Sequence, residues 1–348
     1  MILKTEYCKI GSDPGVNENI FKRGGEIIRA GGLVAFPTET VYGLGANALD
    51  AEASRKIYEA KGRPSDNPLI IHLSRVEDAD KYCQTNELFL RLAEKFLPGP
   101  LTIVLPKRDC IPSTVTGGLD TVAVRIPSDP NARALISAAG VPIAAPSANC
   151  SGKPSPTTAA HVLEDMDGRI DMIIDGGECG IGVESTIVKP GENCLTLLRP
   201  GGITVEMLRE VCPVVLDKAV TEKLSEGERP LAPGMKYRHY APDTKVVLID
   251  SSAEGFIKFI SERAKNGRIG ALVSDSELSA LSDSGAALIS VGNDPDGEAH
   301  RLFAALRQVD SLGCEIVYAR LPDRGGIGLA VYNRILKAAG YEILRPEQ

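Results

Sequence analysis

The sequence predicts an α/β protein of two domains joined by a linker. Three observations indicate this. Short apolar runs alternate with amphipathic stretches in the first part of the chain, a segment rich in Pro, Gly and charge interrupts them at 224–242, and a cleaner alternation follows. The length of 348 residues also suits two domains better than one. We therefore expect domains at 1–210 and 244–348, with a linker at 211–243.

The composition excludes several classes of protein. Hydrophobic residues make up 43% and charged residues 24%, as in ordinary globular proteins, and the net charge of -7 disfavours nucleic-acid binding as the main task. No apolar run approaches the ~20 residues of a membrane span, and MILKTEYCKI lacks a signal-peptide core. The eight cysteines form no C-x-x-C pair and are interpreted as reduced thiols. We expect a cytoplasmic protein with no membrane contact.

In the first domain, helices and strands interleave, which predicts a mixed twisted sheet. Helices are expected at 17–30, 51–60, 87–96 and 130–139. Strands are expected at 33–36, 69–73, 101–105, 121–127, 172–174, 185–188 and 194–198, and a further strand opens the stretch 141–157.

The first domain is organised around the stretch from Gly31 to Ala48. A buried strand, Leu33 to Phe36, is stopped by Pro37, and a hydroxyl-rich turn containing Thr38 and Thr40 follows. A rigid sheet that ends in such a turn often holds a ligand pocket. A tight strand-to-helix connection without a ligand is the alternative for this stretch alone.

Polar side chains gather at the expected strand ends, where acids are scarce. Hydroxyls and amides come from Thr38, Thr40, Ser147, Asn149, Ser151, Ser155, Ser185 and Thr186, and cations from Lys61, Arg63, Arg125 and Arg199. Pro64 and Pro68 are expected to place Lys61 and Arg63 on a fixed loop. Such a surface suits a multiply charged anion and a small polar partner. Arg125, on an otherwise apolar strand, should face a pocket or a fixed anionic partner; the other cations could be solvated surface groups.

The sequence contains no motif for covalent or metal-dependent catalysis. P-loop, G-x-S-x-G and H-E-x-x-H patterns are absent, and His72, His161, His239 and His300 do not cluster. By itself, His72 would more often be a core histidine than a catalytic one. Catalysis would then depend on positioning the substrates and neutralising their charge, and nucleotidyl transfer is a reaction of this kind.

The second domain shows a parallel βαβ rhythm. Strands are expected at 245–250, 269–273, 286–291 and 315–319, and helices at 253–264, 295–309 and 328–339. A G-x-G-x-x-G fingerprint is missing from the expected place. The sequence indicates no site chemistry in this domain.

Seven ordered motifs carry a family resemblance. They are PTETVYGLG, KGRPSDNPLIIH, PGPLTIVL, AVRIP, PSANCSGKPSPT, STIV and LRPGG. Together they resemble the YrdC-type domain, and APGMKYRHYAP with the α/β tail resembles the long, two-domain form of threonylcarbamoyl-AMP synthase. The resemblance implies a YrdC-like twisted mixed sheet with a concave ligand-binding face, plus a smaller Rossmann-like C-terminal domain.

The resemblance also implies an activity. Family members are nucleotidyltransferases that convert L-threonine, bicarbonate and ATP to threonylcarbamoyl-adenylate and pyrophosphate. A downstream transferase then moves the threonylcarbamoyl group onto the adenosine beside the anticodon of certain tRNAs, so tRNA would be contacted indirectly or weakly. Mg²⁺ is expected to arrive with ATP, without protein side chains as ligands.

Residue roles follow from the same resemblance. The threonine side would be lined by Thr38, His72, Arg125, Ala145 and Ser185, with Arg125 on the carboxylate. ATP would be bound by Lys61, Arg63, Ser65, Asn67, Thr121, Ser147, Asn149, Ser155, Arg199 and Tyr237. Lys236, Arg238 and His239 would join Tyr237 in a lid over the nucleotide, although a plain tether is the alternative for the linker.

Two other functions share this fold. A carbamoyltransferase of hydrogenase maturation would need an acylphosphatase-like domain and cysteine-rich zinc fingers, which this chain lacks. A YrdC-type module that binds RNA is disfavoured by the net charge of -7.

Overall fold

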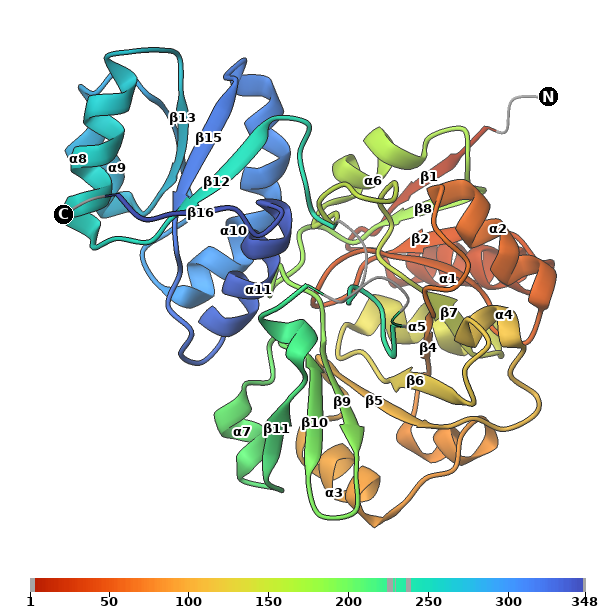
Figure 1. Cartoon of the computed structure of the whole chain (residues 1–348). Coiled ribbons are helices and arrows are strands. Elements are labelled where there is room, and N and C mark those ends of the chain that lie inside the picture. The colour runs from red at the N-terminus through yellow and green to blue at the C-terminus, as the bar shows by residue number, and fades with distance from the viewer. Residues whose placement is uncertain (1–3, 224–227, 229, 236–238, 347–348) are drawn as a thin grey trace. The chain divides into compact units, whose positions relative to one another are not determined.

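The computed structural model describes residues 4–223, 228, 230–235 and 239–346. Contacts divide the chain into two units, each an α/β structure (Figure 1). The first unit comprises Met1–Ser151 and Ser155–Lys236, and the second comprises Gly152–Pro154 and Tyr237–Gln348. In the described part of the chain, no helix combines the length and apolarity needed to cross a bilayer. The predicted α/β class is confirmed.

The first unit is built on an eleven-stranded sheet, which confirms the predicted mixed sheet, although β1, β3 and β11 were not among the expected strands. Its strand order is β1-β8-β2-β3-β7-β4-β6-β5-β9-β10-β11. The strands are β1 Glu6–Lys9, β2 Val34–Phe36, β3 Gly43–Asn47, β4 Ile70–His72, β5 Leu101–Pro106, β6 Thr121–Arg125, β7 Ile143–Ala145, β8 Met172–Asp175, β9 Thr186–Pro190, β10 Leu195–Arg199 and β11 Val214–Leu216.

Helices connect these strands and supply most of the remaining secondary structure of the unit (Figure 1). They are α1 Pro14–Arg29, α2 Ala51–Lys61, α3 Glu87–Phe96, α4 Ser113–Thr116, α5 Pro130–Ala139, α6 Ala159–Met166 and α7 Val205–Arg209, with 3-10 turns η1 Val76–Lys81 and η2 Lys218–Val220.

Helix α1 begins three residues earlier than predicted. The Asp13 carboxylate accepts a hydrogen bond from Gly15 N at 2.9 Å, and Pro14 occupies the first helical turn, where its missing N–H costs nothing. Helices α1 and α5 then bury Ile28 and Leu135 in one apolar cluster with strands β2, β7 and β8. Gly25 allows the close approach of the two helices, because a Cβ there would lie 2.7 Å from the Ala138 backbone.

The organising turn leads into a strand that the sequence analysis missed. After β2, the chain returns as β3, which pairs antiparallel with it from Phe36↔Gly43 to Val34↔Gly45. Gly45 is required by packing, since a Cβ at this position would lie 2.9 Å from the Phe36 ring. The alternative of a direct strand-to-helix connection is therefore wrong, and the hydroxyl turn lies at the tip of a hairpin.

The second unit is a five-stranded, wholly parallel sheet, which confirms the predicted Rossmann-like pattern. Its order is β14-β13-β15-β12-β16, with β12 Lys245–Ile249, β13 Gly270–Val273, β14 Ala287–Ser290, β15 Ile316–Arg320 and β16 Ile343–Leu344. The helices are α8 Ala253–Ala264, α9 Asp275–Leu281, α10 Pro295–Gln308 and α11 Gly328–Ala338, with the 3-10 turn η3 Val309–Leu312.

Candidate functional site

Arg125 ends strand β6 as a buried cation paired with an acid. Its side chain is 5% exposed, and its Nη2 lies 2.9 Å from Oε2 of Glu39. The contact lacks hydrogen-bond alignment, so Nε and Nη2 of Arg125 and Oε2 of Glu39 have no hydrogen-bond partner in the described part of the chain. Burial raises the pKa of Glu39, but the Arg125 charge and a bond from Ser128 N outweigh this and hold that pKa below its usual value. The predicted anionic partner of Arg125 is thus present within the protein.

His72 lies beside Arg125 and is uncharged. It ends β4 directly opposite Arg125 in the parallel β4–β6 pair, and its ring meets the edge of Phe36 at a centroid distance of 6.1 Å. Burial, with the neighbouring Arg125 charge, lowers the pKa of His72 to about 3. A neutral imidazole adds no second positive charge beside Arg125. The local positive charge therefore matches that of a single carboxylate.

A hydroxyl pair continues the site from Arg125 to Arg199. Thr102 on β5 pairs with Arg125 in the antiparallel register, and its Oγ1 lies 2.8 Å from Oγ of Ser185. Arg199 donates to the Ser185 carbonyl from Nε at 3.1 Å and to the Ser185 hydroxyl from Nη2 at 3.2 Å. The structure therefore joins Ser185, predicted to bind threonine, to Arg199, predicted to bind ATP, in one buried network.

Part of the linker packs on this sheet. Ala232 and Met235, both buried, belong to an apolar cluster with Ile70 on β4 and Ala123 on β6. Ala123 and Arg125 share one face of β6 because strand side chains alternate, so these linker residues cover the face that carries Arg125. Nη1 of Arg199 also donates to the Pro233 carbonyl at 3.4 Å.

A second polar group centres on Lys61. Its Nζ donates to the Ser147 carbonyl at 2.6 Å and to the Asn149 carbonyl, while the Ser147 hydroxyl donates to Asn149 Oδ1 at 2.5 Å. Lys61 is the last residue of helix α2, which Gly62 ends in the left-handed conformation at φ 62, so its predicted place on a loop is wrong. The helix fixes the position of this cation.

Four more residues predicted to bind ATP lie in the loop after α2 and at the start of β6. Asn67 is 1% exposed, and neither Oδ1 nor Nδ2 has a hydrogen-bond partner in the described part of the chain. Arg63 donates to the Pro68 carbonyl at 3.2 Å, and Ser65 lies exposed in a turn. Thr121 begins β6 on the same face as Arg125 but at the opposite end of the strand. Among the residues that the structure describes, neither Ser65 nor Thr121 forms a side-chain hydrogen bond or ion pair with another predicted site residue.

Ser155 donates to a buried acid. Its hydroxyl lies 2.7 Å from Oε1 of Glu184, and the two side chains are 0% and 6% exposed as whole residues. With Glu39, this makes two acids among the buried cations and hydroxyls. These acids are few beside the cations Lys61, Arg63, Arg125 and Arg199, and each lies against a buried polar group of the site.

Two of the residues predicted to bind threonine, Thr38 and Ala145, contribute through the backbone and through packing. The Thr38 hydroxyl donates to the Val41 carbonyl at 2.7 Å and accepts from the backbone N of Thr40 at 3.1 Å, so it closes the turn that holds Glu39. Ala145 ends β7 opposite Ile70 and is buried. The predicted lid residues Lys236, Tyr237 and Arg238 lie outside the described residues, and His239 is half-buried in the second unit, 5.5 Å from the Tyr240 ring.

Three polar side chains of the candidate site were not predicted from the sequence. Glu39, Thr102 and Glu184 are polar residues inside otherwise apolar or hydroxyl-rich motifs. Thr102, like Arg125, is a polar side chain on an otherwise apolar strand, and this pattern could have identified it. For Glu39 the sequence contains no such signal, because its partner Arg125 is distant in the chain.

Chemically, this arrangement can bind and orient anions. It contains buried guanidinium and ammonium groups, a hydroxyl pair, a neutral imidazole and an unpartnered carboxamide. No group of three or more His, Cys, Asp or Glu side chains suited to a metal occurs in the described part of the chain. The site therefore suits a carboxylate at Arg125 and a phosphorylated ligand near Lys61.

Two family models match consecutive parts of the chain. The model of Sua5, YciO and YrdC proteins, described as "Telomere recombination", matches residues 26–201. The model described as "Threonylcarbamoyl-AMP synthase, C-terminal domain" matches residues 203–340. The boundary between the two matches, at residues 201–203, lies inside the first structural unit.

Curated relatives are similar over nearly the whole chain. A threonylcarbamoyl-AMP synthase of Pyrococcus abyssi is 46% identical over 333 residues, covering 91% of this chain and 93% of the relative. One of Bacillus subtilis is 42% identical over 349 residues, covering 99% and 100%. A crystal structure of P. abyssi Sua5 complexed with L-threonine superposes with a TM-score of 0.89 at 42% identity, covering 99% of each chain.

Proposed function

Because this chain belongs to the family of two-domain threonylcarbamoyl-AMP synthases, we propose that it converts L-threonine, bicarbonate and ATP to threonylcarbamoyl-AMP, pyrophosphate and water. The threonine amine and bicarbonate form a carbamate with loss of water. A carbamate oxygen then attacks the α-phosphorus of ATP, and pyrophosphate leaves. The substrate supplies the nucleophile, so the protein needs none.

The observation that carries this proposal is the state of Arg125. Two of its nitrogens, Nε and Nη2, are buried without a hydrogen-bond partner in the described part of the chain, although Glu39 offsets its charge. A buried donor without a partner costs roughly 1–3 kcal/mol, which a ligand can recover. A carboxylate accepts from a guanidinium through two parallel bonds. We assign the threonine carboxylate to Arg125, with Glu39 holding the guanidinium in place.

The threonine hydroxyl is assigned to the Thr102–Ser185 pair. Either oxygen of this 2.8 Å contact could donate, so the pair can adapt to a third hydroxyl. Thr38 contributes by fixing the turn, since its own hydroxyl is bonded to the backbone. His72 stays neutral near the threonine, and Ala145 leaves room beside it.

The nucleotide is assigned to the groups around Lys61, and Asn67 offers the clearest support. Its buried carboxamide has an unpartnered donor and acceptor, as hydrogen bonding to a ligand requires. Lys61, Arg63 and Arg199 can offset the charge that develops on pyrophosphate. Ser65, Thr121, Ser147, Asn149 and Ser155 are the remaining assigned ATP residues.

Magnesium is proposed to enter with ATP. Mg²⁺ is commonly bound through substrate phosphates, and the two acids of this site are already engaged, Glu39 with Arg125 and Glu184 with Ser155. When bound, the ion would neutralise phosphate charge.

The fate of the product and the cell compartment belong to the same proposal. A mixed anhydride of a carbamate and AMP is reactive, so a downstream transferase must accept the threonylcarbamoyl group, with tRNA adenosine as its final acceptor. All eight cysteines are free thiols, which supports the expected cytoplasmic location.

Pyrophosphate release tests the proposal directly. With ATP, release should require both L-threonine and bicarbonate. L-Valine has the same shape but no hydroxyl, and it should be used on the order of 10⁴-fold less efficiently because the Thr102–Ser185 pair loses its partner. Release without threonine, or tight RNA binding without any release, would contradict the proposal. Comparable turnover of valine would contradict only the hydroxyl assignment.

A further inference from the structure

The second unit contains a cavity at the carboxyl ends of its central strands. Its volume is about 270 Å³, and its lining includes Ser274 after β13, Arg320 at the end of β15, Glu298 on α10 and Val331 on α11. From β13 the chain continues outward to β14, whereas from β15 it continues to β16 at the other edge. The ends of β13 and β15 thus form a topological switch point, where parallel α/β sheets bind ligands.

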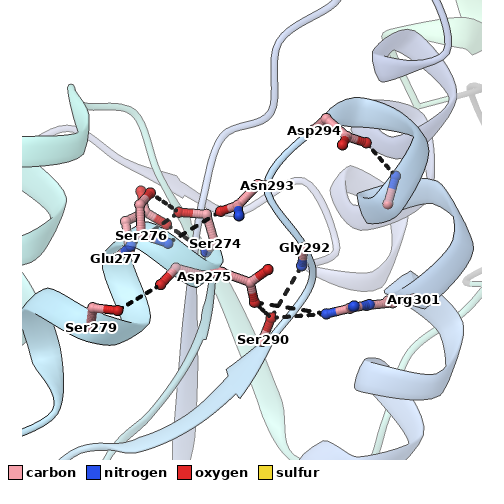
Figure 2. A network of polar contacts seen from close by, with 11 residues as sticks. Ser274, Asp275, Ser276, Glu277, Ser279, Ser290, Gly292, Asn293, Asp294 and Arg301 are labelled. Atoms are coloured by element: carbon pink, nitrogen blue, oxygen red, sulfur yellow. Dashed lines mark hydrogen bonds and ion pairs between the residues drawn. The ribbon is translucent and has the colours of Figure 1, made fainter.

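Hydrogen bonds fix the loops around this cavity (Figure 2). Ser274 and Glu277 form a reciprocal capping box at the start of α9, and Asn293 Oδ1 accepts from Ser276 N at 3.2 Å. Asp294 caps α10 through Gly297 N at 2.7 Å. The rim is therefore ordered before any ligand binds, which lowers the entropic cost of binding.

The charge inside the cavity is not balanced. Oε1 of Glu277 accepts from Nε of Arg320 at 2.6 Å, which pairs the cation of the lining with one acid. The Glu298 carboxylate has no hydrogen-bond or salt-bridge partner in the described part of the chain. Burial, reinforced by Glu277, Asp294 and Asp323, raises the pKa of Glu298 although Arg320 opposes this. A positively charged group at this place would give the Glu298 carboxylate a partner and would offset its repulsion by the neighbouring acids.

The remaining wall is apolar. Leu272, Leu302, Val331 and Ile335 line the cavity and are each at most 4% exposed. A ligand that fills the cavity must therefore bury hydrocarbon as well as present a charge. Phosphates are disfavoured by the surplus of carboxylates, and the residues that the structure describes include no metal-binding group of three acids, cysteines or histidines.

We propose that this cavity is a binding site for a small organic ammonium compound, with Glu298 as the counter-ion of the ammonium group and the apolar wall around its hydrocarbon body. The site is separate from threonylcarbamoyl-AMP synthesis and does not depend on that function. The sequence indicated no site chemistry in this domain because the lining residues are spread from Leu272 to Ile335 without a contiguous motif.

Ligand-observed NMR on the full-length protein tests the site with three probes of similar shape. Isoamylammonium should bind, whereas isocaproate should not, and isoamyl alcohol should bind more weakly than the ammonium. Glu298→Gln should weaken isoamylammonium binding at least about tenfold, because it removes a charge-assisted contact. Glu262→Gln, the same chemical change on the exposed side of α8, is the matched control and should leave binding unchanged.

Intermolecular NOEs locate the probe independently of the variant. Its methyl groups should contact the methyl groups of Leu302 and Val331. Binding of isocaproate as tight as that of isoamylammonium would overturn the proposal. Equal ammonium affinity in the Glu298→Gln protein, or NOEs only to other parts of the chain, would also overturn it.

Discussion

The two units carry charge surpluses of opposite sign at their candidate sites. In the first, the cations Lys61, Arg125 and Arg199 are each at most 5% exposed and outnumber the acids Glu39 and Glu184. In the second, the cavity between the ends of β13 and β15 has an acidic surplus, with Glu298 unpaired in the described residues. The surplus of cations supports the proposal of an anionic ligand in the first unit, and the surplus of carboxylates supports that of an ammonium ligand in the second.

Removing the buried cation Arg125 from the first unit is expected to have the largest effect. Arg125→Ala should weaken L-threonine binding roughly 10- to 150-fold, the value of a lost charge-assisted pair of about 1.5–3 kcal/mol. Nucleotide affinity should stay nearly unchanged. Calorimetric titration with each ligand separately measures both quantities.

Two further variants separate binding from folding. Removing one partner of a buried ion pair destabilises a protein by roughly 3–5 kcal/mol, so Glu39→Gln is combined with Arg125→Ala to neutralise the stranded acid. Arg108→Ala, which removes an exposed cation paired with Asp80, is the control. Unchanged threonine affinity in the double variant would leave Arg125 with a structural role only.

His72 gives a second test, because a neutral histidine beside a buried cation should make the first unit sensitive to acid. Its folded pKa of about 3 lies below the ordinary 6.5, so the unfolded chain binds more protons between these values and stability falls as the pH falls. At pH 5 the loss should be about 2 kcal/mol relative to neutral pH. His72→Asn should abolish this loss. Native-state hydrogen exchange of the β6 amides measures it, and an unchanged pH dependence in the variant would contradict the assignment.

The sequence predicted much of the first site because its residues lie in contiguous motifs at strand ends. Arg125 and Lys61 are recognisable as cations in or beside apolar runs, and the structure brings both into buried networks. Partners distant in sequence could not be predicted. Glu39 and Arg125 meet only because β2 and β6 belong to one sheet, and Thr102 and Ser185 only because β5 and β9 are parallel neighbours.

The fold, too, could be predicted only where the signal lies within a short segment of the sequence. Long amphipathic segments such as α1 and α10 were found within a few residues, because periodicity is a local property. The short strand β3 was missed, since GLGAN has little strand propensity and is held by pairing with Val34–Phe36 and Ile143–Ala144. The short helix α9, which orders the rim of the second cavity, was missed as well.

The linker offers a smaller effect that still distinguishes a lid from a tether. Met235→Ala removes a buried side chain from the cluster with Ile70 and Ala123, and should speed amide exchange of residues 231–235 about tenfold or more without changing exchange of the core strands. Met207→Ala, at a residue 37% exposed, is the control. ATP with threonine should slow exchange of 231–235 in the unsubstituted protein if the segment closes over the site. The absence of ligand protection would favour the tether.

The smallest effect is expected where an ion pair of the second unit is exposed. Nε of Arg345 lies 3.1 Å from Oδ2 of Asp250, close to the 2.9 Å of the Arg125–Glu39 pair, but its two side chains are 80% and 44% exposed. Water already solvates both groups, so Arg345→Gln should change the free energy of unfolding by at most about 1 kcal/mol, and salt should reduce that further. Urea denaturation at low and high salt measures it. A loss as large as that of Arg125→Ala would show that distance, and not burial, sets the energetic weight of these pairs, and would remove the basis for comparing the two units by their buried charge.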